Sequence, residues 1–265
     1  MNCERIVFYR SLLDIFRQEI QLTLNNYVTN VSAYVPNSLE APLIIRFDLN
    51  YQQLAMAEEM KSILSEILDE PLQSVKDMRE AAWVYIFNLL VEKYPESSIG
   101  LQLQQIHCVI RFSDLPLNEH FEFVPFRHPV RLSLSVMKCV LHSFGDRYQC
   151  VRQSIWYCPK KCSNNQNHIL AGEHACKHNC SECNGNLSEY EHRRSTYNCR
   201  MVRVFNAKCL ETPIRYGEIS RNVQVKLSDE LCDAEMVLGQ IYVLIGTYDI
   251  LNQTYVAWQF QRINE

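Results

Sequence analysis

The sequence predicts an α+β fold in which a helical N-terminal subdomain is followed by a small closed β-barrel with an insertion. Three observations lead to this prediction. Apolar residues recur at three- and four-residue steps in the first hundred residues, as on the buried face of a helix. After Gly100, short segments alternate apolar and polar residues, and five or six of the strands predicted there suit a barrel. Between two of them lies a stretch with five cysteines, Trp156 to Cys183.

The first predicted helix presents one apolar stripe to a core and ends at Asn25-Asn26. A mostly apolar segment, Leu43 to Leu49, then predicts a largely buried strand. Asn50 is the expected N-cap of a second helix, which Pro71 breaks, and a third helix spans about Ser74 to Lys93. The stripe of the first helix consists of Ile6, Tyr9, Leu13, Phe16 and Ile20, and the inward positions of the third are Met78, Ala82, Tyr85, Ile86 and Leu89.

The strands predicted after Gly100 are separated by loops, and a proline-bearing connection, Leu115 to Pro129, follows the first of them. In chain order the strands are Gln105–Phe112, Leu132–Leu141, Gln149–Tyr157, Thr196–Cys209, Val223–Leu227, Ile241–Ile245 and Tyr255–Phe260.

The insertion holds two tight cysteine pairs, Cys158-x3-Cys162 and Cys180-x2-Cys183, with seventeen residues between them. Each pair sits on a short turn, so its two thiolates converge on one point. Four sulfurs brought together in this way form the tetrahedral shell that a structural zinc ion prefers. The sequence therefore predicts a zinc ribbon whose Zn2+ is bound by Cys158, Cys162, Cys180 and Cys183.

Other ligand choices remain open in the same stretch. Cys176-x3-Cys180 is an alternative pair, and His168, His174 and His178 are close enough in sequence to compete. A set of ordinary thiols without metal is the remaining interpretation.

Composition narrows the class of protein. Hydrophobic residues make up 47% and charged residues 21%, which predicts a globular chain. The net charge of −4 gives no overall basic field, so any DNA contact needs a local patch. The first residues lack the apolar segment of a secretory signal, and the run from Ala81 to Val91 is too short and polar to span a bilayer. Scattered cysteines such as Cys108, Cys139 and Cys209 favour a reducing compartment.

The motifs of several enzyme classes are missing from the sequence. It has seven glycines and no Gly-Lys-Ser/Thr triplet, G-x-S-x-G or H-E-x-x-H. Zinc deaminases need a proline before a cysteine pair, whereas Pro159 follows a cysteine. Four thiolate ligands would also leave the metal no open position for water. A protein without enzymatic activity is therefore expected.

Basic and aromatic residues gather in the insertion and on the strand that leaves it. A barrel with basic strands and nearby aromatic rings suits single-stranded nucleic acid. A solvated charged rim above buried rings explains the pattern equally well. The residues concerned are Lys160, Lys161, Arg193, Arg194, Arg200, Arg203 and Lys208, with Trp156, Tyr157, Tyr197 and Phe205.

The segment Glu211–Arg221, ETPIRYGEISR, resembles the N-terminal domain of minichromosome maintenance (MCM) proteins. That family carries Glu-x-Pro and Gly-x-Ile-Pro-Arg elements, followed by Leu-Val-Asp and Pro-Gly-Asp. Here Leu231-Cys232-Asp233 and Gly239 to Gly246 occupy the later positions. The resemblance covers nearly the whole chain, and Glu265 falls where the ATPase half of that family would begin. It implies an OB-fold barrel with an inserted zinc ribbon.

Departures from the family pattern point to one of its branches. Ser220 replaces the proline before the arginine, and Leu238-Gly239-Gln240 replaces Pro-Gly-Asp. Lys138 stands where a glycine is usual, and His142 roughly where a DNA-contacting arginine is usual. The chain is more similar to the divergent meiotic branch, that of MCM domain-containing protein 2 and its insect relatives, than to replicative helicase subunits. In insects the N-terminal and ATPase-like halves can be separate polypeptides.

The resemblance implies a non-catalytic nuclear subunit of a meiotic MCM-like complex that promotes crossover formation in meiotic recombination and opposes an anti-crossover helicase. Its implied partners are other MCM-like proteins, including one with the ATPase-like half, and single-stranded DNA is a candidate ligand; no membrane contact is expected. Candidate DNA contacts are Arg203, Lys208 and Arg221. The alternatives are a stand-alone single-stranded-DNA-binding OB-fold protein and a replicative MCM-like accessory subunit. The expected boundaries are 1–100 for the helical subdomain, 101–157 and 191–265 for the barrel, and 158–190 for the zinc ribbon.

Overall fold

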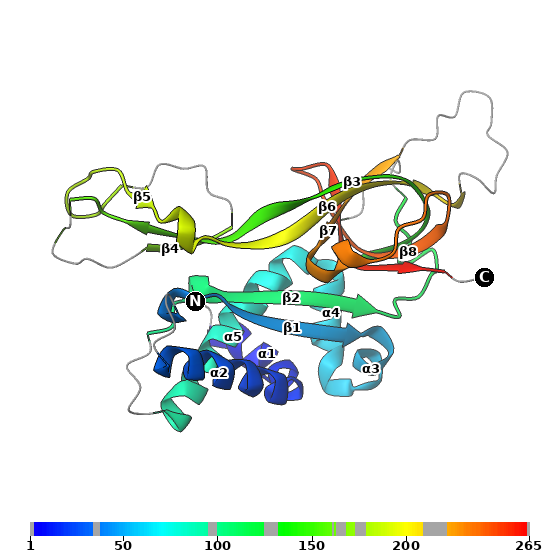
Figure 1. Ribbon diagram of the computed structural model, residues 1–265. Helices are drawn as coiled ribbons and strands as arrows, with labels where there is room; N and C mark the ends of the chain where they lie inside the picture. Colours follow the sequence, from blue (N-terminus) through cyan, green and yellow to red (C-terminus); the bar gives the residue numbers. More distant parts are fainter. Residues whose placement is uncertain are drawn as a thin grey trace. The chain divides into compact units, whose positions relative to one another are not determined.

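The computed structural model describes residues 3–33, 38–94, 100–124, 132–160, 162, 168–172, 179–208 and 222–263. These residues group into two compact units. Their helices and strands are labelled in Figure 1. The first unit takes residues 1–46, 77–109 and 149–197, and the second takes 47–76, 110–148 and 198–265. The protein is α+β, with helices in its N-terminal part and a closed five-stranded barrel in the second unit.

The first unit contains α1 (Cys3–Ile15), α2 (Arg17–Ser32) and most of α5 (Pro71–Lys93). Burial of Tyr9, Leu13 and Ile20 confirms that the predicted apolar stripe faces a core. The predicted end at Asn25-Asn26 is wrong, because α2 continues to Ser32. Leu24, Tyr27 and Val28 are buried on both sides of the asparagines, and this packing outweighs the weak helix propensity of asparagine.

Side-chain hydrogen bonds fix the segment of the first unit around residues 39–41. Two short 3-10 turns, η1 (Ser38–Glu40) and η3 (Leu103–Gln105), lie in this unit. The buried Gln105 amide donates to the Leu39 and Ala41 carbonyl oxygens at 2.9 and 3.1 Å. Gln153 donates to the Glu40 carbonyl oxygen at 2.5 Å, and Arg193 pairs with the Glu40 carboxylate at 2.8 Å. The chain around η1 is therefore tied to the residues that lead into and out of the cysteine-rich insertion.

β1 (Leu43–Asn50) pairs with β2 (Ile106–Ser113) in a two-stranded sheet. The prediction that β1 is largely buried is wrong. Its residues alternate between buried and exposed, and Ile44 is 41% exposed, because one face of a two-stranded sheet meets solvent.

Asn50 caps α3 (Tyr51–Met56) as predicted, since its side chain accepts a hydrogen bond from the Gln53 backbone N–H at 3.1 Å. The predicted second helix is divided into α3, η2 (Glu58–Met60) and α4 (Lys61–Asp69), because Ala57 has an extended backbone. Pro71 begins α5, where its missing N–H has no helical partner to lose.

The barrel consists of β3 (Ser135–Tyr157), β6 (Ser195–Asn206), β7 (Val223–Ser228), β9 (Thr254–Arg262) and β8 (Ile241–Asp249), in this order around the sheet. Residues Ser135–Val140 of β3 also pair with β8, which closes the barrel. β7 and β9 are parallel, whereas β6–β7 and β8–β9 are antiparallel. This pairing order makes the barrel OB-like.

β3 is one strand of 23 residues where the sequence predicted two. Residues 142 and 144–149 are exposed, so the hydrophobic alternation that marks a strand is lost in its middle. Backbone pairing continues through this stretch because it does not depend on a buried side-chain face.

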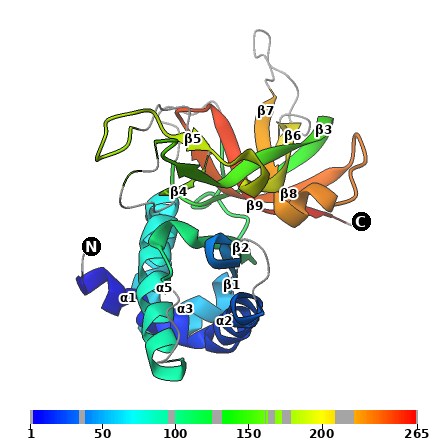
Figure 2. The same ribbon diagram turned by 60° about the vertical axis from the view of Figure 1, so that its left-hand side comes forward.

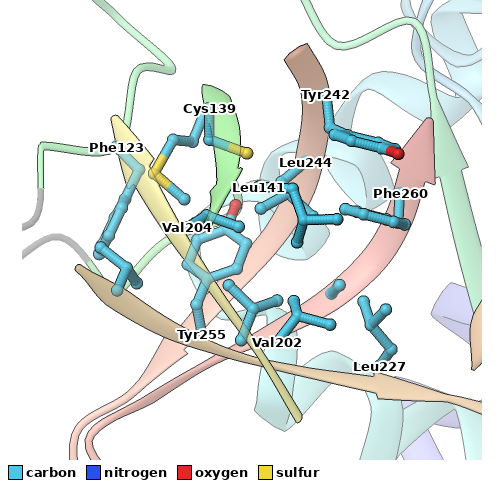
Figure 3. Close-up of a cluster of buried hydrophobic side chains, with 14 of the residues drawn as sticks. Phe123, Cys139, Leu141, Val202, Val204, Leu227, Tyr242, Leu244, Tyr255 and Phe260 are labelled. Atoms are coloured by element: carbon cyan, nitrogen blue, oxygen red, sulfur yellow. The ribbon is translucent and has the colours of Figure 1, made fainter. Parts of the chain in front are cut away.

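The barrel core is apolar and continuous (Figure 3). Phe123, Cys139, Val202, Leu244 and Tyr255 are buried and converge there from different elements. β8 bulges between Ile245 and Gly246.

A nearly buried arginine, Arg111, joins two elements of the second unit. It pairs with the Glu230 carboxylate and donates to the Ser228 carbonyl oxygen, which anchors η5 (Asp229–Asp233) to β2. No helix within the described ranges is long and apolar enough to cross a membrane.

Candidate metal centre

The cysteine-rich insertion begins at the end of β3 and pairs with it again through two short strands. Two short strands that the sequence did not predict, β4 (His168–Ala171) and β5 (Ser188–Glu189), both pair with β3. Trp156 stands opposite His168 on one side and Glu189 on the other. Strands of two to four residues carry too few positions for an alternation pattern to identify them.

The second cysteine pair lies on a tight turn. The Cys180 N–H donates to the Gly185 carbonyl oxygen at 2.8 Å, and the Asn184 N–H donates to the Cys180 carbonyl oxygen at 2.9 Å. Asn184 has a φ of 51°, in the left-handed region that asparagine tolerates better than most residues. The turn places the thiols of Cys180 and Cys183 on one side of the chain.

The structure brings the four predicted cysteine ligands together. Their sulfur atoms all lie within 4.8 Å of one another. Three separations are 3.5 Å for Cys158–Cys162, 3.6 Å for Cys158–Cys183 and 3.8 Å for Cys162–Cys180. Four sulfurs at about 2.3 Å from one ion, in a tetrahedron, are separated by about 3.8 Å. The cluster therefore fits a single four-coordinate metal ion.

The electrostatics of the cluster also favour a cation. Hydrogen bonds from the backbone N–H groups of Cys183 and Glu182 lower the pKa of Cys180 to about 7. Hydrogen bonds with the neighbouring thiols, that of Cys183 first, raise the pKa of Cys162. Without a positive ion the four groups cannot all be thiolates, because each added negative charge opposes the next. Zn2+ removes this conflict and prefers four thiolate ligands.

Of the alternative metal ligands, the structure describes only His168. His168 is exposed in β4, and the ligand cluster found among the described residues holds the four cysteines without it. Cys176, His174 and His178 lie outside the described residues. With four thiolates in place, the shell is full and leaves no position for a water nucleophile.

Most of the predicted basic patch is already engaged in ion pairs or ring contacts. Arg194 holds Glu189 through two hydrogen bonds of 2.8 and 2.6 Å, and Arg193 holds Glu40. Arg200 lies over the Phe144 ring, and Lys208 pairs with Glu122 at 2.6 Å. Each contact must be weakened before the cation can bind phosphate, which lowers the gain from such binding.

Arg203 differs from these residues. Its side chain is exposed on β6 opposite Gln224 of β7, and within the described ranges it makes no ion pair. Arg221 lies outside the described residues, as does the whole motif from Glu211 to Arg221.

The structure adds a ring contact that the sequence reasoning missed. His142 of β3 packs against the Phe205 ring of β6, with centroids 4.8 Å apart. Phe205 is two residues from Arg203, so both side chains leave the same face of β6, away from the buried Val202 and Val204. The alternation of buried and outward positions in β6 is the signal that would have paired Phe205 with Arg203.

No protein-family model matches the chain, and no curated protein matches it. Function is therefore inferred from the barrel, the cysteine cluster and the residue patterns. The later parts of the motif series, Leu231–Asp233 and Gly239–Gly246, lie among the described residues. Cys232 is buried in η5, and Gly239 takes a φ of 78° in the turn before β8. A left-handed turn explains a glycine at position 239 in any family.

Proposed function

We propose that this protein is a non-catalytic subunit of a meiotic MCM-like complex in the nucleus, where it promotes crossover formation. One observation carries the proposal. The cysteine cluster is inserted between β3 and β6, which are neighbours in a closed OB-like barrel, and helices precede the barrel in the chain. The resemblance to the MCM N-terminal domain implies this same order of elements.

Zinc has a structural task in this proposal. A full shell of four thiolates can fold the insertion but cannot activate water, so the ion is not a catalyst. The exposed side chains around the second cysteine pair are polar: Asn179, Ser181, Glu182, Asn184 and Asn186. Contact with another subunit is the task that the resemblance implies for the ribbon.

The partners follow from the same resemblance. The complex contains other MCM-like proteins, one of which carries an ATPase-like half, and it opposes an anti-crossover helicase. Affinity purification of the tagged chain from germline tissue tests this assignment. Recovery of an MCM-like ATPase protein is the expected outcome. Recovery of replication-licensing subunits alone would assign the chain to replication instead.

A second candidate function is supported by the outward face of β6. The exposed Arg203 and the tilted His142–Phe205 ring pair combine a cation with ring surface, as proteins that bind single-stranded nucleic acid do. In this reading the barrel binds single-stranded DNA without a partner.

Oligonucleotide binding by the purified chain tests the second candidate. Arg203→Glu should weaken binding and reduce the dependence of affinity on salt concentration, whereas Lys208→Glu should act less because Glu122 already neutralises that cation. Lys76→Glu, an exposed charge reversal on α5, is the matched control. If Arg203→Glu and Lys76→Glu have equal effects, this face of β6 is only a solvated rim.

A further inference from the structure

The turn of the first cysteine pair carries a lysine that lies against the turn of the second pair. Lys160 is in the turn between Cys158 and Cys162. Residues 179–187 carry the second pair and lead into β5, which lies beside the end of β3 in Figure 2. A Cβ atom built on Gly185 would stand 3.6 Å from Cε and 3.8 Å from Nζ of Lys160. The ammonium group from one turn is therefore next to the backbone of the other.

The same point is close to one of the predicted metal ligands. The Cβ position at Gly185 is 3.3 Å from the sulfur of Cys183, so this sulfur and the ammonium group of Lys160 are both within 4 Å of one point. A side chain at position 185 would press on the sulfur, because 3.3 Å is tighter than an ordinary van der Waals contact. Glycine at this position thus leaves room for the lysine side chain beside the cluster.

A metal-bound cluster of this kind has a charge that needs compensation. Zn2+ with four thiolates has a surplus of two negative charges. On one side of the cluster, the backbone N–H groups of Cys183 and Glu182 donate hydrogen bonds to the sulfur of Cys180. On the side of Cys183, the nearby positive charge is the ammonium group of Lys160. Attraction between this group and the thiolates lowers the energy of the metal-bound cluster.

We propose that Lys160 is the counter-ion of the metal centre and determines how tightly the chain retains zinc. The lysine is not a ligand; it acts through its charge on the thiolates, that of Cys183 first. The inference rests on the structural zinc of the proposed function. It adds a residue that the cysteine spacing does not indicate, because the contact depends on how the two turns fold against each other.

Competition for zinc between the reduced full chain and a chromogenic chelator tests the role of this charge. At about 0.01 M salt, Lys160→Gln should weaken zinc binding about threefold and Lys160→Glu about tenfold. Both losses should shrink at about 1 M salt, where charges more than about 3 Å apart are screened. Lys160→Arg should bind zinc as the wild type does, because it keeps the positive charge.

Two controls separate the charge from other effects of substitution. Lys93→Gln removes an exposed charge at the end of α5 in the same unit and should leave the affinity for zinc unchanged. Co2+ in place of zinc reports the metal shell through its absorption bands. Equal intensity of the thiolate charge-transfer and d–d bands in all variants would show that each keeps four thiolate ligands in a tetrahedron.

The possible failures can be told apart. Wild-type affinity in Lys160→Glu at low salt would overturn the inference. Equal losses in Lys160→Gln and Lys160→Arg, unchanged by salt, would also overturn it, because the lysine would then act by packing on Gly185 and not by charge. A wild-type chain that binds neither zinc nor cobalt would remove the metal centre itself, and with it the structural task of zinc in the proposed function.

Discussion

His107 in β2 is an imidazole that the fold keeps neutral. Burial lowers its pKa from 6.5 to about 4, the nearby Arg152 and Arg79 charges act in the same direction, and a hydrogen bond with Gln153 opposes them. His107 therefore takes up a proton near pH 6.5 in the unfolded chain but only near pH 4 in the folded chain. Stability falls as pH drops through this window, by up to roughly 3 kcal/mol from this group.

Replacement of this histidine should flatten the acid side of the stability profile. His107→Gln removes the proton uptake of the unfolded state, so its free energy of unfolding should fall less between about pH 6.5 and pH 4 than that of the wild type. Urea titrations at several pH values measure the difference. His168→Gln, a change at an exposed histidine, is the matched control. Parallel profiles for all three proteins would show that burial does not shift the pKa of His107.

Gly246 occupies a position in β8 that no side chain can share. A Cβ atom there would overlap the Val256 carbonyl oxygen of the neighbouring strand and press on the Tyr255 ring. Gly246→Ala should therefore lower the free energy of unfolding by about 3 kcal/mol, in the range of overpacked cores.

Urea denaturation measures this loss, and Gly145→Ala in β3 is the matched control. A Cβ at position 145 would meet only the Met201 carbonyl oxygen at 3.7 Å, an ordinary van der Waals contact. Its stability should stay within about 0.5 kcal/mol of the wild type. Equal effects of the two substitutions would contradict the close approach of β8 and β9.

Local chemistry explains which single-residue predictions were confirmed. The N-cap at Asn50 was predictable because the side chain needs only the N–H three residues later in the chain. Lys208 could not be assessed in this way, since its partner Glu122 is 86 residues away in the sequence. A basic residue in a sequence pattern gives no sign of a carboxylate that folding brings beside it.

The cysteine insertion is the element whose stability should depend on metal. Purified protein should contain about one zinc ion per chain, because a closed four-thiolate shell binds a single ion. Cys183→Ser should lose that zinc and the cooperative unfolding of the insertion, whereas Cys108→Ala, at a thiol outside the cluster, should keep both. Elemental analysis and hydrogen exchange measure the two properties. An intact insertion in metal-free protein would exclude the ribbon.

Elements with a regular pattern were predictable, and elements without one were not. The first helical stripe and β7 show clear periodicity because one side of each meets a core. The middle of β3 shows none, because it is exposed, so one long strand was predicted as two. The cysteine ligands needed no period, since their spacing alone indicates the chemistry.

At the scale of the whole molecule, the sequence predicted the order of parts better than their pairing. The succession of helices, strands and insertion follows from local patterns. Closure of the barrel depends on contacts such as β3 with β8, and the parallel pairing of β7 with β9, which no local pattern encodes. The boundaries expected near residues 100, 157 and 190 stay predictions, as does the MCM-like identity.

The position of the insertion between β3 and β6 affects how these two strands pair during folding. Residues 158–194 separate these neighbouring strands in the sequence. Pairing of the strands therefore costs the conformational entropy of closing that loop. Each halving of the effective loop length saves about 0.6 kcal/mol of closure free energy. A metal ion that joined Cys158 and Cys162 to Cys180 and Cys183 would shorten the loop before the strands meet. The order of events in folding would then be metal capture first and barrel closure second, so that refolding speed would depend on free zinc.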